Sequence, residues 1–274
     1  PPYFNAVFVP LMLPLMGLMI LSNRSRWWAT DRSLLTASQG IFAVIAVVAS
    51  VGVAWAAGEI KVWIVVISSL SFMILLNLCH EFYRRVGQKS NPITRLFRQP
   101  VALYAMFLGH LGIAVSALGI VTTVMLSEEA DLRMAAGDIA EVGAYTVRFY
   151  GTTNVDGPNY VADRGRVDVL RAGQAVATLF PEKRRYLASQ SVMTEADIHV
   201  RMLGDIYVAL GEPLESGAWA VRVHIKPLVR FIWIGGVLIA LGGVISIFDR
   251  RYRLNVSRRV RQSSVATNQE PVHG

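Results

Sequence analysis

The chain has 274 residues, 53% of them hydrophobic, and a mean hydropathy of +0.43, which is too apolar for an ordinary soluble domain. Its formal charge of +8 is concentrated in short basic segments beside apolar runs, so the distribution argues against a nucleic-acid-binding protein. Cys79 is the single cysteine, which excludes an internal disulfide, a Cys-x-x-Cys redox pair and a multi-cysteine metal site.

Three apolar runs near the start of the chain predict membrane-spanning helices, because a span needs about 20 mostly apolar residues. These spans cover about residues 4–21, 35–57 and 62–78. Pro10 and Pro14 are expected to bend the first span, which neighbouring helices tolerate in a membrane. Gly58–Lys61 predicts a tight turn between the second and third spans.

A fourth predicted span runs from Gln99 to Leu126 and carries His110 near its middle, about 15 Å along the helix axis from Pro100. An unpaired imidazole at this depth is costly, so His110 is a candidate functional residue. Imidazole is a common axial ligand of haem iron. Alternatively, His110 forms a hydrogen bond to another helix, and the residue types leave both interpretations open.

The two faces of this span differ when residues are placed at 100° intervals. Small residues, which allow another helix to approach closely, form one stripe. They are Gly109, Gly112, Ser116 and Gly119. His110 points roughly the opposite way, near Met106, Ala114 and Ala117, and the two alanines are expected to leave room for a flat ligand such as a macrocycle.

From Ser127 to about Lys226 the composition changes, since most of the acidic residues lie here and several segments alternate between apolar and polar residues. Ala172-Gly-Gln174 predicts a hairpin turn between two of these segments. The segments are 145–150, 166–170, 175–180, 197–202, 205–209 and 219–225. They predict a small β-rich domain outside the membrane, inserted between the fourth and fifth spans.

The fifth predicted span covers about Leu228 to Phe248 and contains four glycines suited to close helix packing. These are Gly235, Gly236, Gly242 and Gly243. Basic segments follow the first, third and fifth spans, at 23–32, 84–98 and 249–261. Cytoplasmic loops are the basic ones, so we expect the N-terminus of this chain and the β domain outside and the C-terminus inside.

The predicted fold is therefore a polytopic α-helical membrane protein with five transmembrane helices and a β-rich periplasmic domain between helices four and five. The predicted divisions are four spans with basic cytoplasmic loops at 1–126, the β-rich domain at 127–226, the fifth span at 227–249 and a basic cytoplasmic tail at 250–274.

Other chemistry-bearing side chains have a structural as well as a functional interpretation. Cys79-His80 are adjacent on a helix and point in different directions, which argues against a shared metal site. His199 and His224, on predicted strands, either contact a ligand or are satisfied within the domain. Lys183-Arg-Arg185 either attracts an acidic group, such as haem propionates, or is a solvated charge cluster, and Trp27-Trp28 is typical of an interfacial anchor.

Several long motifs follow one another in a characteristic order. They are Gly109–Ile120, Pro181–Tyr186, Asp205–Glu212, Lys226–Trp233 and Phe248–Arg253. Together they resemble the C-terminal portion of the CcmF/NrfE family, the CcmF-type haem lyase subunits of bacterial cytochrome c maturation. The resemblance covers nearly the whole chain, and because the chain begins with Pro1 rather than Met, we expect it to be one piece of a longer polypeptide.

The resemblance implies that His110 is one of two axial ligands of a membrane-embedded b-type haem, with the second ligand outside this chain. It implies a haem lyase that attaches haem to the Cys-x-x-Cys-His motif of apocytochrome c on the periplasmic side of the bacterial inner membrane. No residue here takes a catalytic role, and we expect no activity from this portion alone. The implied partners are the haem chaperone CcmE, apocytochrome c, CcmH, CcmI and the N-terminal portion of the same protein.

A competing hypothesis is a non-enzymatic membrane scaffold or transporter subunit, in which His110 pairs with a polar group. A transporter should show further polar or broken helices around a site at the membrane midplane. Apart from the prolines of the first span, the predicted spans offer little of this kind.

Overall fold

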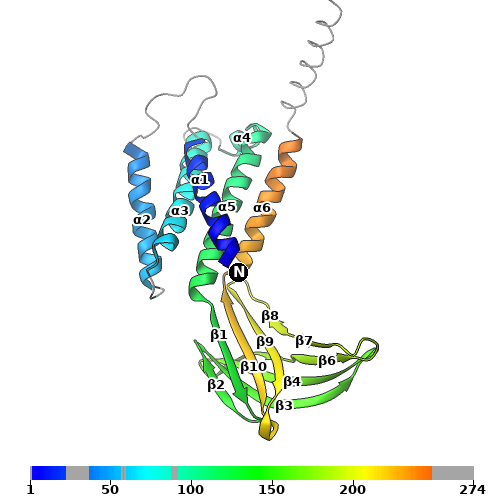
Figure 1. Ribbon diagram of the computed structural model, residues 1–274. Coiled ribbons are helices and arrows are strands. Elements are labelled where there is room, and N and C mark those ends of the chain that lie inside the picture. Colours follow the sequence, from blue (N-terminus) through cyan, green and yellow to red (C-terminus); the bar gives the residue numbers. More distant parts are fainter. Residues whose placement is uncertain (1, 23–36, 57, 59, 88–91, 249–274) are drawn as a thin grey trace, which may run out of the picture. The chain divides into compact units, whose positions relative to one another are not determined.

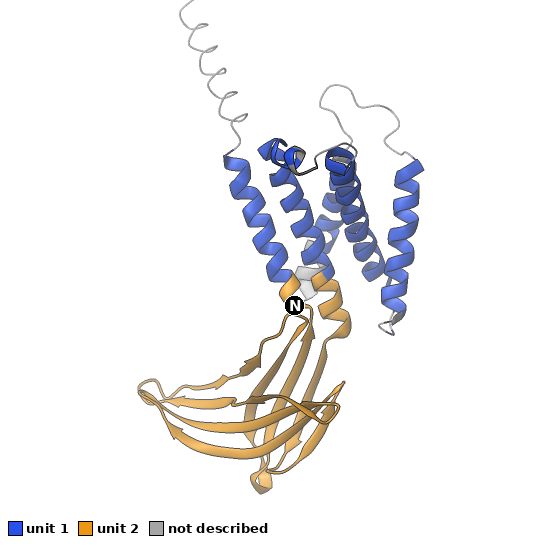
Figure 2. Cartoon of the chain, turned by 180° about the vertical axis from the view of Figure 1, so that it is seen from behind, with its two compact units in different colours: residues 1–118, 232–274 blue, residues 119–231 orange. Residues whose placement is uncertain are grey.

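The structure is a computed structural model that describes residues 2–22, 37–56, 58, 60–87 and 92–248 (Figure 1). The basic segment at 23–32, with Trp27 and Trp28, and the basic tail from 249 onward lie outside the described residues. The chain divides into a helical unit, residues 1–118 with 232–274, and a β-rich unit, residues 119–231 (Figure 2).

Helices make up the first unit. They are α1 (Pro2–Ser22), α2 (Ala37–Ala56), α3 (Val62–Phe82) with a π-helical extension (Tyr83–Gly87), α4 (Pro92–Phe97), α5 (Val101–Leu126) and α6 (Val229–Ile247). The last turns of α5 and the first turn of α6 belong to the β-rich unit.

Four of these helices, α2, α3, α5 and α6, are long and apolar enough to cross a membrane. The span that contains α3 is 26 residues long and continues to Gly87, further than the sequence predicts. In α1, which contains Pro10 and Pro14, the apolar stretch in the described residues is Val9–Leu21. A fifth crossing therefore stays a prediction.

The helical unit has a small apolar core to which three helices contribute. Met16 and Ile20 of α1 pack with Ile74 and Leu78 of α3 and with Ala114 of α5. Helices α2 and α3 form an antiparallel pair. The turn between them contains Gly58, whose φ of 77° suits the predicted turn.

The β-rich unit contains two sheets, as the alternating segments of the sequence predict. One sheet has the order β1-β10-β9-β8 and the other β2-β3-β4-β6-β7, with β5 pairing on β4. The strands are β1 (Glu128–Met134), β2 (Ile139–Val142), β3 (Tyr145–Asp156), β4 (Tyr160–Arg171), β5 (Gln174–Leu179), β6 (Glu182–Tyr186), β7 (Val192–Glu195), β8 (Asp197–His199), β9 (Gly204–Pro213) and β10 (Trp219–Pro227).

Alternation along the strands fills one continuous core between the sheets. On β3, for example, Tyr145, Val147 and Phe149 are buried while the residues between them are at least partly exposed. The core combines these side chains with valines of β4 and with apolar side chains of β9 and β10, including Ile206 and Val221. Each sheet thus buries one face against the other, as in a β-sandwich.

Turns of the β-rich unit follow local sequence signals. Ala172 and Gly173 both have positive φ, 49° and 78°, which is the conformation of a two-residue hairpin turn between β4 and β5. The predicted turn at Ala172-Gly-Gln174 is therefore confirmed.

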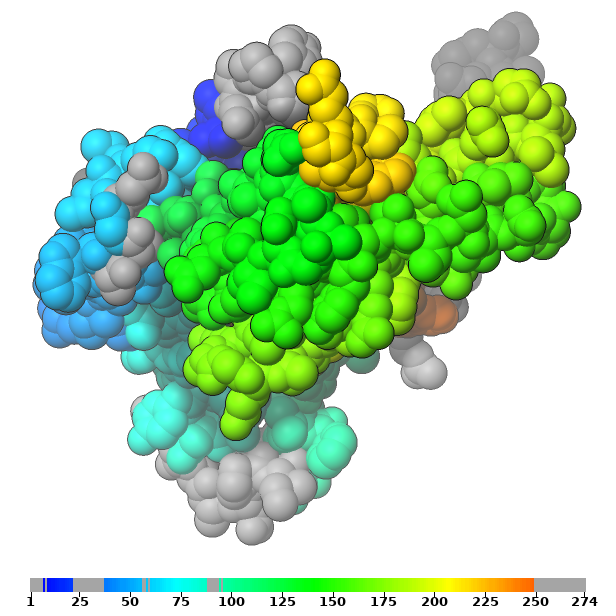
Figure 3. All heavy atoms as spheres, turned by 90° about the horizontal axis from the view of Figure 1, so that it is seen from below, coloured from blue at the N-terminus to red at the C-terminus, as the bar shows by residue number. Residues whose placement is uncertain are grey.

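The turn between β9 and β10 is held against the end of β1. In the space-filling view this yellow turn lies beside the green end of β1, where Arg133 Nη2 donates to Glu215 O at 3.3 Å (Figure 3).

Candidate functional site

His110 lies in the middle of α5, a helix of 26 residues whose interior carries no other titratable side chain near neutral pH. Its Nδ1 lies 2.9 Å from the carbonyl oxygen of Met106, one turn earlier. A carbonyl oxygen only accepts hydrogen bonds, so Nδ1 carries the proton and Nε2 keeps a lone pair.

The Nε2 atom of His110 is buried and has no hydrogen-bond partner among the described residues. A buried polar atom without a partner costs free energy, and native proteins usually pair it. Metal-bound histidines show this arrangement, because the second ring nitrogen donates to a carbonyl and thereby fixes the tautomer and the ring. The ring of His110 is therefore held in one orientation with a lone pair on Nε2, which is what a metal-binding histidine requires.

The small-residue stripe of α5 packs against α6, as the sequence predicts. A Cβ atom built on Gly112 would lie 2.6 Å from Gly235 O and 2.8 Å from Ile239 N, so the backbones touch. Ser116 Oγ also donates to Ile232 O at 3.1 Å. Contacts of this kind replace the hydrophobic effect as the association force between helices in lipid.

The glycines of α6 are not equivalent. Gly235 and Gly242 are buried against α5, whereas nothing lies within 4 Å of a Cβ atom built on Gly236 or Gly243. The stripe fixes the rotation of α5, and His110 faces away from α6 as a result.

The room expected beside Ala114 is absent. Ala114 is completely buried and packs with side chains of α1 and α3, with Ala117 partly buried at the edge of the same cluster. Because the side chain of Ala114 is small, the neighbouring helices can approach it closely, and an empty space there would cost their van der Waals contacts. The expectation of free space at this alanine was therefore wrong for the chain as described.

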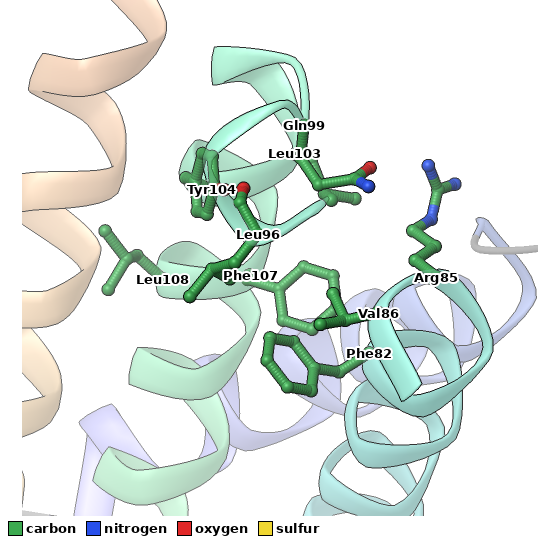
Figure 4. Close-up of a pocket in the computed structure, with 9 residues that line it drawn as sticks. All are labelled: Phe82, Arg85, Val86, Leu96, Gln99, Leu103, Tyr104, Phe107 and Leu108. Atoms are coloured by element: carbon green, nitrogen blue, oxygen red, sulfur yellow. Dashed lines mark hydrogen bonds between the residues drawn. The ribbon is translucent and has the colours of Figure 1, made fainter. Parts of the chain in front are cut away.

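An apolar cavity of about 250 Å³ lies between the end of α3 and the start of α5 (Figure 4). Its lining includes Leu103 and Phe107, which precede His110 by about two turns and one turn on the same side of α5. The ring of Phe107 meets that of Phe82 edge to face, with centroids 6.2 Å apart, and Arg85 lies at the cavity's edge (Figure 4). Pockets for drug-sized ligands are larger, about 300–1,000 Å³, so this cavity is too small to enclose a macrocycle.

The helices also bury polar residues that the sequence patterns did not predict. Gln39 Nε2 of α2 donates to Asn77 Oδ1 of α3 at 2.6 Å, and both side chains are buried. One turn later, buried Glu81 pairs with Arg84 at 2.9 Å and with Arg85 at 2.5 Å. The four-residue spacing of Asn77 and Glu81 in an apolar run was the signal for one polar helix face.

The other predicted candidates are not brought together into a metal site. Cys79 is exposed on α3, while the ring of His80 makes an edge contact with Phe42 of α2, with centroids 5.5 Å apart. His224 Nε2 lies 3.3 Å from Glu129 Oε1, and His199 lies on β8. Among the described residues no three His, Cys, Asp or Glu side chains form a group that could hold a metal ion.

The basic segment Lys183-Arg-Arg185 forms most of strand β6, and two of its charges are engaged within the unit. Lys183 donates to Gly211 O at 3.0 Å and pairs with Glu212. Arg184 stacks over the ring of Tyr160 at 4.4 Å and pairs with Glu182 at 2.7 Å. Arg185 is exposed, so this side chain remains available to an acidic partner.

Glu182 anchors the charge cluster of the β-rich unit. Burial raises its pKa, but hydrogen bonds and charges of Arg184 and Arg164 outweigh that effect, so the pKa lies below the ordinary value of 4.5. Because the pKa is lower when the protein is folded, ionised Glu182 stabilises the fold above about pH 4.5, and this contribution is lost as the pH falls through the lowered pKa.

Replacing Glu182 by Gln is expected to destabilise the unit by about 1–2 kcal/mol at neutral pH, because two half-exposed arginines lose a charged partner. The penalty should shrink as the pH falls below about 4. Unfolding followed by fluorescence between pH 7 and pH 3 measures it. Glu195→Gln is the matched control, since Glu195 is more exposed and lies 3.8 Å from Arg184. An equal loss in both variants at pH 7 would contradict this account.

Comparison with known proteins extends these observations to the whole chain. The family model described as the CcmF C-terminal β-sandwich matches residues 125–227. The chain is 44% identical over 269 residues to the cytochrome c-type biogenesis protein CcmF of Pseudomonas aeruginosa and 36% identical over 257 residues to that of Escherichia coli. It is 27% identical over 256 residues to the cytochrome c-type biogenesis protein NrfE of Haemophilus influenzae.

These three alignments cover 96%, 93% and 91% of the chain, but 40%, 39% and 38% of the relatives. The chain therefore spans about two fifths of the length of the curated relatives it matches. A solved structure called Cytochrome c Heme Lyase CcmF shares the fold, with a TM-score of 0.70 and 15% identity over 90% of this chain and 40% of that chain.

Proposed function

We propose that this chain, which matches the C-terminal portion of CcmF proteins, is part of a haem lyase of cytochrome c maturation. The reaction would join haem covalently to the two thiols of a Cys-x-x-Cys-His motif in apocytochrome c, on the periplasmic side. The names of the relatives and of the structural neighbour support this proposal.

The observation that carries a haem-related role is the buried, unpartnered Nε2 of His110. With Nδ1–H donated to Met106 O, His110 would hold the iron of a b-type haem through Nε2. A haem bound there would supply one-electron redox chemistry. His110 would hold the iron and tune its potential through the Met106 hydrogen bond, and it would not take part in thioether formation.

A second residue to hold the iron would come from the N-terminal portion of the same protein. The described part of this chain offers a single unpartnered imidazole nitrogen at membrane depth and a cavity too small for a macrocycle. The portion present here would therefore form one side of the haem site and would be inactive alone.

The reacting thiols would belong to the substrate, since Cys79 lies on α3 near the end that leads into the basic loop. The positive-inside rule would put that end of α3 in the cytoplasm, and the N-terminus of this chain and the β-rich unit in the periplasm of a multi-pass inner-membrane protein. The β-rich unit would then provide a docking surface for CcmE, apocytochrome c, CcmH or CcmI.

His110→Ala in the complete protein is the experiment that tests the haem site. We expect the reduced-minus-oxidised absorption of the b haem to fall by at least about tenfold, because the iron loses an axial ligand. His80→Ala and His224→Ala are matched controls, since each removes an imidazole that already has a contact within the chain.

An unchanged spectrum in His110→Ala would refute the ligand role. It would favour the scaffold or transporter hypothesis, in which the imidazole bonds to a polar group of another helix. Pyridine haemochrome quantification of each purified variant separates haem loss from a change in the coordination of haem that stays bound.

A further inference from the structure

The loop between β8 and β9 exposes apolar side chains to an unusual degree. Val200, Met202 and Leu203 are 53%, 64% and 72% exposed. Most of the apolar side chains of the neighbouring strand β9 are buried in the core, so this loop is a local exception. We call residues 200–203 the apolar loop.

The apolar loop lies where the chain enters α6. The N–H of Leu228 donates to Leu203 O at 3.1 Å, one residue before α6 begins. A Cβ atom built on Gly204 would lie 2.9 Å from Pro227 Cα, so the two backbone segments are in contact. Figure 1 shows the start of β9 beside the start of α6.

The same place adjoins the end of α5. Thr123 Oγ1, in the last turn of α5, donates to Pro227 O at 2.9 Å. All of these residues belong to the β-rich unit. The apolar loop is therefore level with the ends of two helices that are long and apolar enough to cross a membrane.

Polar contacts hold the apolar loop in one orientation. Asp205 Oδ1 accepts from the backbone N–H of Arg201 at 3.1 Å and from Arg230 Nε at 3.2 Å. The Arg201 guanidinium turns inward and donates to the hydroxyl of Tyr145. Met202 and Leu203 are thereby left facing out of the unit.

We propose that Met202 and Leu203 insert into the interfacial region of the lipid bilayer and dock the β-rich unit on the membrane. The ends of α5 and α6 mark the level of the headgroups, and apolar side chains at this level gain free energy by leaving water for the acyl boundary. Lys226 lies opposite Asp205 in the β9–β10 pair and is exposed, so it supplies a cation at the level of the lipid phosphates.

A spin label at position 203 tests the insertion. Leu203→Cys is introduced into the complete protein in a background without other cysteines, labelled and reconstituted in nanodiscs of phosphatidylcholine and phosphatidylglycerol. Power-saturation electron paramagnetic resonance then compares access of oxygen, which concentrates in lipid, with access of a water-soluble nickel chelate. We expect oxygen access to exceed nickel access at position 203, and a label from Met202→Cys to behave in the same way.

Leu214→Cys is the matched control. Leu214 is an exposed leucine just beyond the opposite end of β9, about 36 Å from Leu203 at 3.3 Å per residue, so nickel access should exceed oxygen access there. Nickel access that exceeds oxygen access at 203 and 202 as well would overturn the proposal, because the loop would lie in water. Low access to both reagents would also overturn it, because another part of the complete protein would cover the loop. Both readouts are independent of haem binding.

Discussion

Replacing Phe149 by alanine is expected to destabilise the β-rich unit by about 3–5 kcal/mol, because a large, completely buried side chain leaves a cavity in the core. Phe149 lies on β3, and its ring packs against Gly165 of β4, which has no side chain. A Cβ atom built on Gly165 would lie 3.3 Å from Phe149 and 3.5 Å from Leu210 of the other sheet. Phe149 thus packs at a point where side chains of both sheets meet.

Hydrogen exchange of the complete protein in nanodiscs measures this loss. The amides of β3, β4 and β9 should exchange about 100- to 3,000-fold faster, at 1.4 kcal/mol for each tenfold change. Phe180→Ala is the control, since Phe180 is 48% exposed and should change exchange little. Similar acceleration in both variants would show that Phe149 does not support the core.

Local patterns predicted much of this fold. Alternation along the segment from Tyr145 set the buried face of β3, and Ala172-Gly-Gln174 marked a hairpin turn whose first two residues have positive φ. The small residues of α5 predicted a tight helix contact, and the contact with α6 follows from them. Each of these features depends on residues near one another in the sequence.

Features that join distant segments were not predicted. The buried Gln39–Asn77 hydrogen bond spans 38 positions, and Arg201 reaches Tyr145 across 56. Neither residue identifies its partner, because many polar residues elsewhere could have filled the same role. The prediction of free space beside Ala114 was wrong for a related reason. An alanine allows either a cavity or a closer neighbouring side chain, and the packing of distant segments decides which.

The sequence pointed to the candidate site through one residue, and the structure adds the hydrogen bonding of that residue. His110 stood out in the sequence as an imidazole in an apolar span. The bond from Nδ1 to Met106 O and the unpartnered Nε2 follow from the helix and its neighbours, and no sequence pattern specifies them. The rotation of α5 that turns His110 away from α6 depends on the contact between small residues, so this contact also determines the direction in which His110 points.

Replacing Gly235 by valine is therefore expected to disturb both the stability of the helical unit and the placement of His110. A Cβ atom at Gly235 would lie 2.5 Å from Gly112 O and 2.6 Å from Ser116 N. These are backbone atoms of α5 and cannot move aside, so the helices must separate. Overpacking of this kind costs about 1–3 kcal/mol, which corresponds to a fall of about 2–12 °C in the apparent unfolding temperature of a unit of this size.

Gly236→Val distinguishes this steric effect from a change in helix propensity. Gly236 is the next residue of α6, nothing lies within 4 Å of its added Cβ atom, and both substitutions gain the same intrinsic helix propensity. The unfolding temperature, read as the loss of monodisperse protein after heating in detergent, should change by less than about 2 °C in Gly236→Val. If the unfolding temperature fell equally in both variants, the α5–α6 contact could not be what determines the rotation of α5. A loss confined to Gly235→Val, accompanied by a weakened b-haem spectrum, would connect helix packing to the orientation of His110.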